Sequence, residues 1–403
     1  MVTTFYPPYH FGGDGTYVRA LAKGLVQRGH EVTVIHCEDA YRLRGQEAEL
    51  EQINDHGVTV HRIHKDQRVL SPLITQQLGI PGLKAGVLRE ILDDDFDVVN
   101  FHNISLIGGP GVLSLSKAPR NVYTLHEHWL LCPTHIFWKN QQRACDRPEC
   151  IRCCVRSGIP PQWWRYTSLL QRNLMSVNLF LSPSEYTARR HREQLELQAP
   201  VEVLPLFSAL DPVPEVQPSS TGELLFVFAG RMVASKGVRE LLATFRRTPQ
   251  YRLILLGDGE LLLELRRRYA DCDNIEFKGA VPQPELVAYY RRATAVILPS
   301  LAPETFGLTV VEAFACGTPA LVRAAGGNRD TIDVSGAGYV YEDEPGLLQA
   351  MAQFSADPGL RPRLGQMARR AYEQHYTEEK HVSRYLDLVT SIPENTGGQL
   401  IWK

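Results

Sequence analysis

The stretch LPSLAPETFGLTVVEAFACGTPALVRAAGG, from Leu298 to Gly327, places two carboxylates eight residues apart across an expected strand, loop and helix. Glu304 falls in the loop after the strand Ala295–Ser300, and Glu312 falls inside the helix that follows. That helix is expected to begin near Phe306, Gly307 and Leu308. Backbone N–H groups at a helix start lack intrahelical partners, and together with the helix dipole they bind anions. The stretch therefore predicts a phosphate cradle flanked by two acceptors for sugar hydroxyls, as in a nucleotide-sugar site.

The size and composition of the chain indicate a globular protein of two or three domains, because it has 403 residues with 44% hydrophobic and 22% charged residues. Lys and Arg number 43 against 45 Asp and Glu, a balance that argues against a nucleic-acid partner. No apolar run approaches the roughly 20 residues of a membrane span. The N-terminus lacks the charged and apolar regions of a signal peptide. We therefore expect a cytoplasmic protein.

Short apolar runs alternate with helical patterns along the chain, which predicts parallel α/β architecture. A second such series begins at Leu224, after the Pro-rich stretch Leu204–Glu223, which has the composition of a linker. We predict two doubly wound domains facing each other across a cleft, at residues 1–205 and 206–375, with ligands at the carboxyl ends of the strands. The first strand, Val2–Tyr6, is short, so either the natural strand begins upstream or it is an edge strand.

The motifs taken together resemble the retaining glycosyltransferases of family 4, which have the GT-B fold. The likeness covers nearly the whole chain, and its specificity lies in the order and spacing of motifs that are individually weak. They are YPPYHFGGDGTYVRALAKGLVQRGHEVTVI, DVVNFH, FAGRMVASKG, LLGDGE, FKGAV and PETFGLTVVEAFACGTPAL. The resemblance implies two Rossmann-like domains and a C-terminal helix, within residues 376–403, that crosses back to the first domain.

Two cations follow the strand LLFVFAG, and their position suits a diphosphate leaving group. Arg231 offers a planar fork and Lys236 a point charge. By resemblance both stabilise the departing nucleoside diphosphate, Glu304 lies near the donor sugar, and Glu312 grips the ribose hydroxyls. The alternatives are a solvated basic loop and acids that only complement a helix dipole. Glu312 lies inside the apolar run VVEAFA, where an ionisable group is normally paired or functional.

The N-terminal half contributes a glycine pair and a histidine. Gly12 and Gly13 lie between a strand and a helix, where glycine allows close approach of a ligand; an ordinary tight turn is the alternative. His126 ends the strand NVYTLH, and by resemblance it contacts the donor sugar beside the reacting centre. His102 ends DVVNFH and is the weaker candidate, with a structural role expected.

The resemblance implies transfer with retention at the anomeric carbon, in which the leaving phosphate deprotonates the acceptor hydroxyl. The protein then supplies orientation and charge stabilisation, so no protein nucleophile is needed. No Asp-x-Asp motif stands in a matching place, and Asp93, Asp94 and Asp95 have the character of a solvated helix end. We therefore expect that catalysis needs no metal or other cofactor.

Five of the eight cysteines lie between residues 132 and 154, in an insertion absent from the typical family core. The spacing resembles a structural zinc or iron–sulfur site, and a loop of unligated thiols is the alternative. The proposed ligands are Cys132, Cys145, Cys150 and Cys153. We expect the loop of about residues 130–160 to be a lid over the acceptor side.

Two further segments bear on partners. Leu206 stands where many family members have a polar residue, which removes one expected contact to the donor. The segments Trp163–Arg165 and Arg189–Arg192 are aromatic and basic, and they support at most weak peripheral membrane contact.

Three functions remain open on the sequence. The first is a hexosyltransferase that moves a sugar from a UDP-, GDP- or ADP-linked donor to a glycan, a lipid-linked saccharide or a small molecule. The second is a nucleotide-sugar 2-epimerase, which shares the fold but fits the motifs less well. The third is a nucleotide-sugar-binding subunit without catalysis, against which the retained Arg231, Lys236, Glu304 and Glu312 argue.

Overall fold

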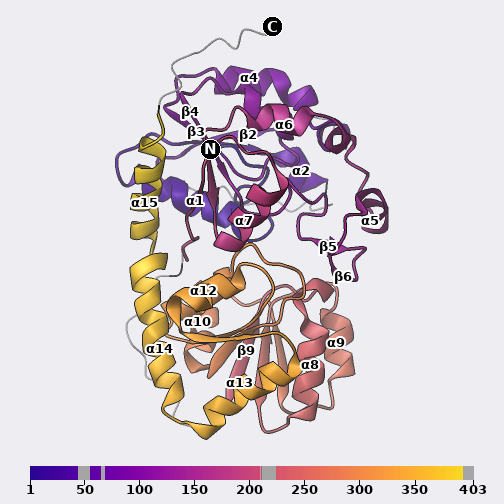
Figure 1. The fold of residues 1–403 in the computed structure, drawn as a ribbon, viewed down its shortest axis with the longest axis vertical. Coiled ribbons are helices and arrows are strands. Elements are labelled where there is room, and N and C mark those ends of the chain that lie inside the picture. The colour runs from indigo at the N-terminus through magenta and orange to yellow at the C-terminus, as the bar shows by residue number, and fades with distance from the viewer. Residues whose placement is uncertain (44–54, 65–68, 209, 211–223, 394–403) are drawn as a thin grey trace. The chain divides into compact units, whose positions relative to one another are not determined.

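The computed structural model describes residues 1–43, 55–64, 69–208, 210 and 224–393. The chain divides into two compact units, and each contains a parallel β-sheet (Figure 1). Unit 1 comprises Met1–His135, Gly158–Leu204 and Glu378–Lys403, and unit 2 comprises Ile136–Ser157 and Pro205–Thr377.

The sheet of unit 2 has six parallel strands in the order β11-β10-β9-β12-β13-β14. Their bounds are β9 Leu225–Ala229, β10 Arg252–Leu256, β11 Ile275–Gly279, β12 Ala295–Leu298, β13 Ala320–Arg323 and β14 Gly338–Tyr341. From β9 the chain adds β10 and then β11 on one side. It then adds β12, β13 and β14 on the other side of β9. The strand order therefore reverses between β9 and β12, which is where open α/β sheets bind their ligands.

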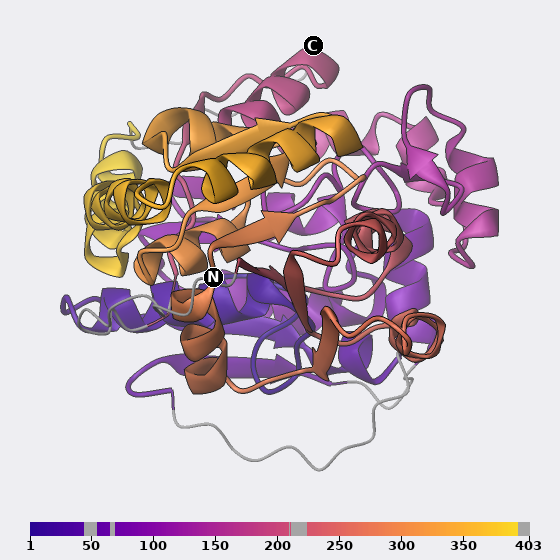
Figure 2. The same cartoon turned by 90° about the horizontal axis from the view of Figure 1, so that it is seen from below.

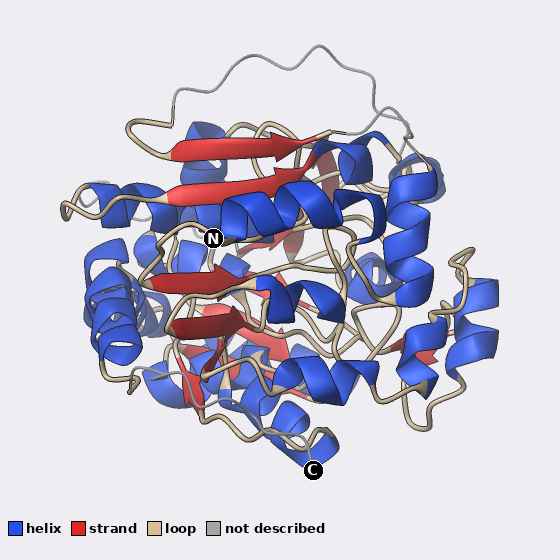
Figure 3. Cartoon of the chain, turned by 90° about the horizontal axis from the view of Figure 1, so that it is seen from above, coloured by secondary structure: helices blue, strands red, loops and turns tan. Residues whose placement is uncertain are grey.

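Side chains of these strands alternate between the two faces of the sheet, and both faces are buried. Phe226 and Phe228 enter one hydrophobic cluster, whereas Leu225 and Val227 enter another. Helices and some loop residues complete both clusters, and strands lie between layers of helices in Figures 2 and 3. The helices are α8 Val238–Arg247, α9 Leu262–Arg268, α10 Gln283–Arg292, α11 Leu308–Ala315, α12 Asn328–Ser335, α13 Glu344–Ala356 and α14 Leu360–Ala371, with a 3-10 turn η4 Ala234–Lys236 and a π-helical turn η5 Tyr372–Tyr376. This is the doubly wound arrangement that the alternating pattern predicts.

The strands of unit 1 are also parallel and form two ladders, β1-β2 and β3-β4-β7-β8. Their bounds are β1 Thr33–Cys37, β2 Thr59–Ile63, β3 Val98–Phe101, β4 Arg120–Thr124, β7 Leu179–Ser182 and β8 Val201–Val203. Val2 forms parallel bridges to both Ile35 in β1 and Phe101 in β3, so it joins the two ladders. The first segment therefore lies inside the sheet and is not an edge strand, which was one of the two interpretations of its short length.

The helices of unit 1 include the C-terminal one. They are α1 Gly13–Val26, α2 Glu38–Arg42, α3 Leu70–Leu78, α4 Ala85–Leu92, α6 Leu169–Leu174, α7 Glu185–Gln194 and α15 Glu378–Thr390, with 3-10 turns η1 Gly82–Lys84, η2 Pro110–Leu115 and η3 Trp163–Tyr166. α15 lies beside α1 (Figure 1), where Arg28 donates to the carbonyl of Glu379 over 3.1 Å. Asn100, in β3, donates to Tyr385 of α15 over 3.2 Å.

The observed division differs from the predicted one chiefly in the cysteine-rich segment. The boundary lies between Leu204 and Pro205, whereas the sequence placed it between 205 and 206. Residues 136–157 group with unit 2, although we expected them in the first domain. They contain the short strands β5 Trp138–Lys139 and β6 Arg143–Ala144 and the helix α5 Cys150–Arg156. Most of the predicted linker, at 209 and 211–223, lies outside the described residues.

Within the described part of the chain, every helix is too short or too polar to cross a bilayer.

Candidate active site

An ion pair lies at the reversal point of the unit 2 sheet. Lys236 ends η4, in the loop after β9, and Glu304 lies in the loop after β12. The Nζ of Lys236 is 2.5 Å from Oε1 of Glu304, and the Ser300 hydroxyl donates to the same oxygen over 2.6 Å. The side chains of Lys236 and Glu304 are 28% and 21% exposed. Both therefore face solvent in part and can exchange this contact for a ligand.

Backbone contacts fix the two loops to each other. Leu301 and Ala302 both donate their N–H groups to the carbonyl of Ser235, over 2.8 and 3.0 Å. Gly237 has φ +67°, and a Cβ there would lie 2.0 Å from the carbonyl oxygen of Pro299. Only glycine fits this position, because an added carbon would clash with backbone that cannot rotate away.

Glu304 is held from its other side by the loop after β13. Its N–H donates to Ala325 over 3.1 Å, and its carbonyl accepts from Gly327 over 2.7 Å. Gly326, between them, has φ +82°, and a Cβ there would be 2.2 Å from the Glu304 carbonyl oxygen. The carboxylate therefore projects from a backbone that is fixed on both sides.

The start of α11 lies directly after this loop. α11 begins at Leu308 with Gly307 as its N-cap, and no side chain caps it. Phe306 and Gly307 are buried, and the Gly307 carbonyl accepts from Val310 over 2.8 Å. The amide-rich helix start predicted at Phe306, Gly307 and Leu308 is thus present, and its first turn carries no acidic side chain that would compete with an anion.

The second carboxylate, Glu312, lies inside α11 and contacts α10. The Tyr290 hydroxyl donates to Oε2 of Glu312 over 3.0 Å. Burial raises the pKa of Glu312 to about 7, and the hydrogen bond from Tyr290 opposes that rise. Glu312 is therefore poised to lose its proton near neutral pH. Glu304 lies in the loop and Glu312 in the helix that follows it. The two carboxylates have different partners and different environments.

Arg231, the other predicted cation, lies immediately beyond β9 and is exposed. Its carbonyl accepts from Val233 over 2.9 Å. Its guanidinium has no ion-pair or hydrogen-bond partner among the described residues, so it does not join the pair that Lys236 and Glu304 form.

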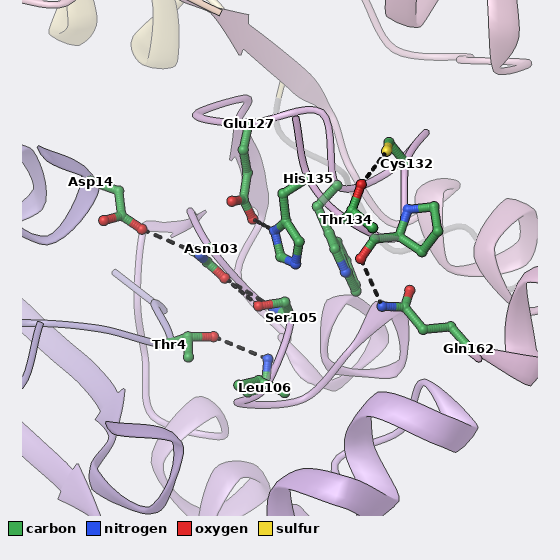
Figure 4. A network of polar contacts seen from close by, with 12 residues as sticks. Thr4, Asp14, Asn103, Ser105, Leu106, Glu127, Cys132, Thr134, His135 and Gln162 are labelled. Carbon is green, nitrogen blue, oxygen red and sulfur yellow. Dashed lines mark hydrogen bonds and ion pairs between the residues drawn. The ribbon is translucent and has the colours of Figure 1, made fainter. Parts of the chain in front are cut away.

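In unit 1 the glycine pair lies at the start of a helix, directly before a partly buried acid. Gly12 has φ +86° with nothing within 4 Å of an added Cβ, and α1 begins at Gly13. The next residue, Asp14, accepts from the Asn103 side chain over 3.2 Å. Burial, and then the charge of Glu127, raise the pKa of Asp14 to about 6. Figure 4 shows Asp14, Asn103 and Ser105 joined by hydrogen bonds, close to the contact of Glu127 with His135.

His126 follows β4 and has a histidine neighbour. Its Nε2 lies 2.9 Å from Nδ1 of His102, which follows β3. Burial lowers the pKa of His126 to about 3, and the nearby His381 adds to the shift. The structure therefore brings together both histidines that end adjacent strands, although the sequence ranked His102 as structural only.

Two family models match the chain and together cover most of it. The model described as "Glycosyltransferase Family 4" matches residues 11–207, and "Glycosyl transferases group 1" matches residues 212–371. The chain belongs to the family 4 glycosyltransferases. The predicted enzyme class is thereby confirmed.

Relatives of this glycosyltransferase extend over nearly its whole length. It is 23% identical to an uncharacterized glycosyltransferase of Methanocaldococcus jannaschii, over 94% of both chains. It is 26% identical to the glycogen synthase of Mycobacterium tuberculosis H37Rv, over 92% of this chain and 88% of that protein. A shorter match, over 36% of this chain and 38% of the other, is 32% identical to D-inositol 3-phosphate glycosyltransferase of Kribbella flavida.

Solved structures similar to the glycosyltransferase confirm its fold. Sucrose-phosphate synthase from Thermosynechococcus elongatus matches with a TM-score of 0.70 at 18% identity, over 96% of this chain and 97% of that one. Anabaena HepE in complex with UDP-glucose matches with a TM-score of 0.64 at 16% identity, over 97% and 99%. The predicted GT-B class of two Rossmann-like domains is therefore correct.

The four predicted cysteine ligands can be followed one by one in the structure. Among the described residues, no group of three or more His, Cys, Asp or Glu side chains is placed to hold a metal ion. Cys132 lies 3.3 Å from the Thr134 hydroxyl, and Cys153 accepts the Asn140 N–H over 3.3 Å. Cys145 contacts the Arg147 carbonyl, and Cys150 begins α5. The zinc or iron–sulfur site remains a prediction that this geometry does not support.

Sequence reasoning missed several partners of the site residues. Ser300 and Tyr290 bond the two glutamates, yet neither stands at a spacing that would indicate a contact. Asn328, which begins α12, is fully buried with neither side-chain polar atom bonded among the described residues, and its Oδ1 would lie 3.0 Å from a Cβ on Gly307. Asp14 was also not selected from the sequence. The signal for it was its position, because this carboxylate directly follows Gly12-Gly13.

Proposed function

We propose that this glycosyltransferase moves a sugar from a nucleoside diphosphate donor to an acceptor hydroxyl, with retention at the anomeric carbon and without a metal ion. The observation that carries the proposal is the contact between Lys236 and Glu304 at the point where the strand order reverses. The adjacent α11 start supplies an anion site there. Solved structures of the similar Anabaena HepE contain UDP and UDP-glucose, which favours the same class of ligand here.

Each residue of the site has a role in this proposal. Lys236 and Arg231 neutralise the diphosphate, and the first N–H groups of α11 bind its oxygens. Glu312 accepts hydrogen bonds from the ribose hydroxyls, and Glu304 accepts them from the transferred sugar. When the donor binds, Lys236 divides its charge between Glu304 and the phosphate. The resemblance to the family also assigns donor contacts to His126 and to the backbone at Gly12 and Gly13.

The leaving phosphate itself takes the proton of the acceptor hydroxyl in this proposal. The bond from the anomeric carbon to the diphosphate oxygen breaks while the acceptor oxygen forms its bond on the same face. The proton moves from the acceptor hydroxyl to the leaving oxygen, so the protein provides no nucleophile. Its contribution is to hold the reactants in place and to stabilise the charge that grows on the diphosphate.

Incubation with a panel of UDP-, GDP- and ADP-sugars tests this function. We expect slow donor hydrolysis with one nucleoside diphosphate, unchanged by EDTA, and release of a sugar that early NMR spectra show with the anomeric configuration of the donor. An inverted product would overturn retention, and loss of activity in EDTA would overturn metal independence. Formation of an epimer, or binding without turnover, would replace the transferase with one of the other two functions.

A further inference from the structure

The histidine beside the proposed reacting centre is tied to a second, deeper histidine. β3 and β4 pair in parallel, with Phe101 opposite Tyr123, and His102 and His126 follow these strands by one and two residues. Their rings are 5.1 Å apart at 26°, and Nδ1 of His102 is 2.9 Å from Nε2 of His126. His102 is 1% exposed, whereas His126 keeps some exposed surface.

Both imidazoles are uncharged at neutral pH. Burial, and then the neighbouring His126, hold the pKa of His102 well below its usual value. Burial and His381 lower the pKa of His126 to about 3. A neutral imidazole has one N–H and one lone pair. A single proton therefore lies between His102 Nδ1 and His126 Nε2, and one ring must be the donor.

The environment of His102 decides which ring donates. Its Nε2 is buried and has no hydrogen-bond partner among the described residues. If His126 donated, His102 would carry its proton on Nε2, as a buried N–H without an acceptor. A buried donor or acceptor without a partner costs about 1–3 kcal/mol, and orphan N–H donors are the rarer of the two in native structures. If His102 donates from Nδ1, only a lone pair is left at the buried Nε2.

We propose that His102 is a positioning residue that donates from Nδ1 to Nε2 of His126 and so keeps the proton of His126 on Nδ1. His126 then offers the substrate a neutral hydrogen-bond donor, which suits a sugar hydroxyl oxygen or a developing negative charge. It cannot act as a base from that nitrogen. The inference rests on the proposed function, in which His126 contacts the transferred sugar.

Tyr17 of α1 and His381 of α15 lie close to His126, and His381 is one cause of its lowered pKa. The edge of the Tyr17 ring, from α1, faces His126 at 5.0 Å. The Tyr17 hydroxyl is 2.7 Å from Nε2 of His381 on α15. Burial raises the pKa of Tyr17 well above its usual value, so its hydroxyl stays protonated. His102, Tyr17 and His381 together form the wall behind His126.

Nitrogen-15 NMR of the full chain with labelled histidine tests the tautomers directly. Two-bond proton–nitrogen correlations distinguish Nδ1–H from Nε2–H, and the variants His102→Asn and His126→Asn assign the two rings among 13 histidines. We expect both rings to be neutral from pH 6 to 8 and both to carry Nδ1–H. A proton on Nε2 of His126, or titration of either ring in that range, would overturn the proposal.

A pair of variants at position 102 tests positioning through turnover. His102→Asn retains a donor at the Nδ1 position, whereas His102→Leu fills the space without one. We expect His102→Leu to lower kcat for donor hydrolysis at least tenfold with KM changed less than about twofold, and His102→Asn to recover most of the rate. His191→Leu removes another buried histidine of unit 1, whose Nδ1 contacts the Thr187 carbonyl, and serves as the control for packing loss. A folded His102→Leu protein with the wild-type kcat would contradict a positioning role.

The two measurements separate this inference from the proposed function. NMR reads the tautomer in the protein without any substrate. The expected tautomer without hydrolysis of any donor would count against the function alone. Hydrolysis together with the reversed tautomer would count against this inference alone.

Discussion

At the residue scale, each of the two candidate glutamates is held by a hydroxyl from another part of the fold, Glu304 by Ser300 and Glu312 by Tyr290. Glu304, Glu312 and Lys236 could be chosen because strand ends and a helix start locate them in one sheet. Ser300 and Tyr290, which bond the glutamates, could not, since their contacts depend on how neighbouring elements pack. The same reason explains His102, whose importance follows only from the pairing of β3 with β4.

Lys236→Ala is expected to reduce donor hydrolysis by at least about 100-fold, because it removes a cation from a developing diphosphate charge. The partly exposed ion pair with Glu304 contributes only about 0–1 kcal/mol, so the melting temperature should barely change. Lys278→Ala is the matched control, since Lys278 pairs with Glu276 elsewhere in unit 2. Turnover close to wild type would remove Lys236 from the site.

Glu312 predicts a pH dependence of donor binding. Its pKa is raised from 4.5 to about 7, so the unliganded carboxyl is largely protonated below pH 7. Ribose hydroxyls donate best to the carboxylate. Affinity should therefore rise as pH increases through 7, by roughly tenfold between pH 6 and pH 8.

Isothermal titration with an intact nucleotide sugar measures this effect without interference, because its diester-like phosphates do not titrate in that range. Glu312→Gln should bind more weakly and lose the pH dependence. The same dependence in the Gln variant would assign the titration to another group.

At the element scale, the site depends on loops after β9, β12 and β13 that are joined through backbone. The strand ends expected from the sequence mark where these loops begin, and the loop segments FAGRMVASKG and RAAGG contain glycines. The reason for those glycines was not visible in the sequence. Gly237 and Gly326 are required because another backbone lies against each Cα, and this contact exists only in the folded sheet.

Gly237→Ala is expected to destabilise the protein by at least about 1 kcal/mol more than Gly279→Ala in chemical denaturation. Both glycines have positive φ, at +67° and +77°, so both variants carry the same left-handed strain. A Cβ at Gly237 would also meet Pro299 at 2.0 Å, whereas nothing lies within 4 Å at Gly279. Equal losses would show that the loop after β12 moves away easily.

At the scale of the whole molecule, alternating apolar runs predicted two doubly wound domains, and that prediction holds. Two details were not predictable from sequence neighbours, because they depend on contacts between distant parts of the chain. Val2 is internal to the sheet, since it pairs with strands from distant parts of the chain. Residues 136–157 follow unit 1 in sequence but group with unit 2. The proposed cysteine ligands are near in sequence, and spacing alone did not show that they meet.

Because α15 belongs to unit 1, its removal should destabilise unit 1, although α15 follows unit 2 in the sequence. Val382 lies against Gly24 of α1, with Cγ2 3.0 Å from an added Cβ, and Leu388 and Val389 are also buried. Each buried side chain contributes about 1.5–3 kcal/mol, so truncation after Thr377 should destabilise unit 1 by several kcal/mol. Truncation after Pro393 keeps all of α15 and is the control.

Differential scanning calorimetry with and without the donor nucleotide can assign the damage to one unit. The nucleotide stabilises the unit that binds it, by about 2.7 kcal/mol at 100 times Kd. Since the proposed diphosphate and ribose contacts all lie in unit 2, the truncated protein should keep a transition that the nucleotide shifts upward. The transition that the nucleotide does not shift should fall or disappear, because unit 1 has lost a helix of its core. A truncated protein whose nucleotide-shifted transition falls instead would mean that α15 stabilises unit 2.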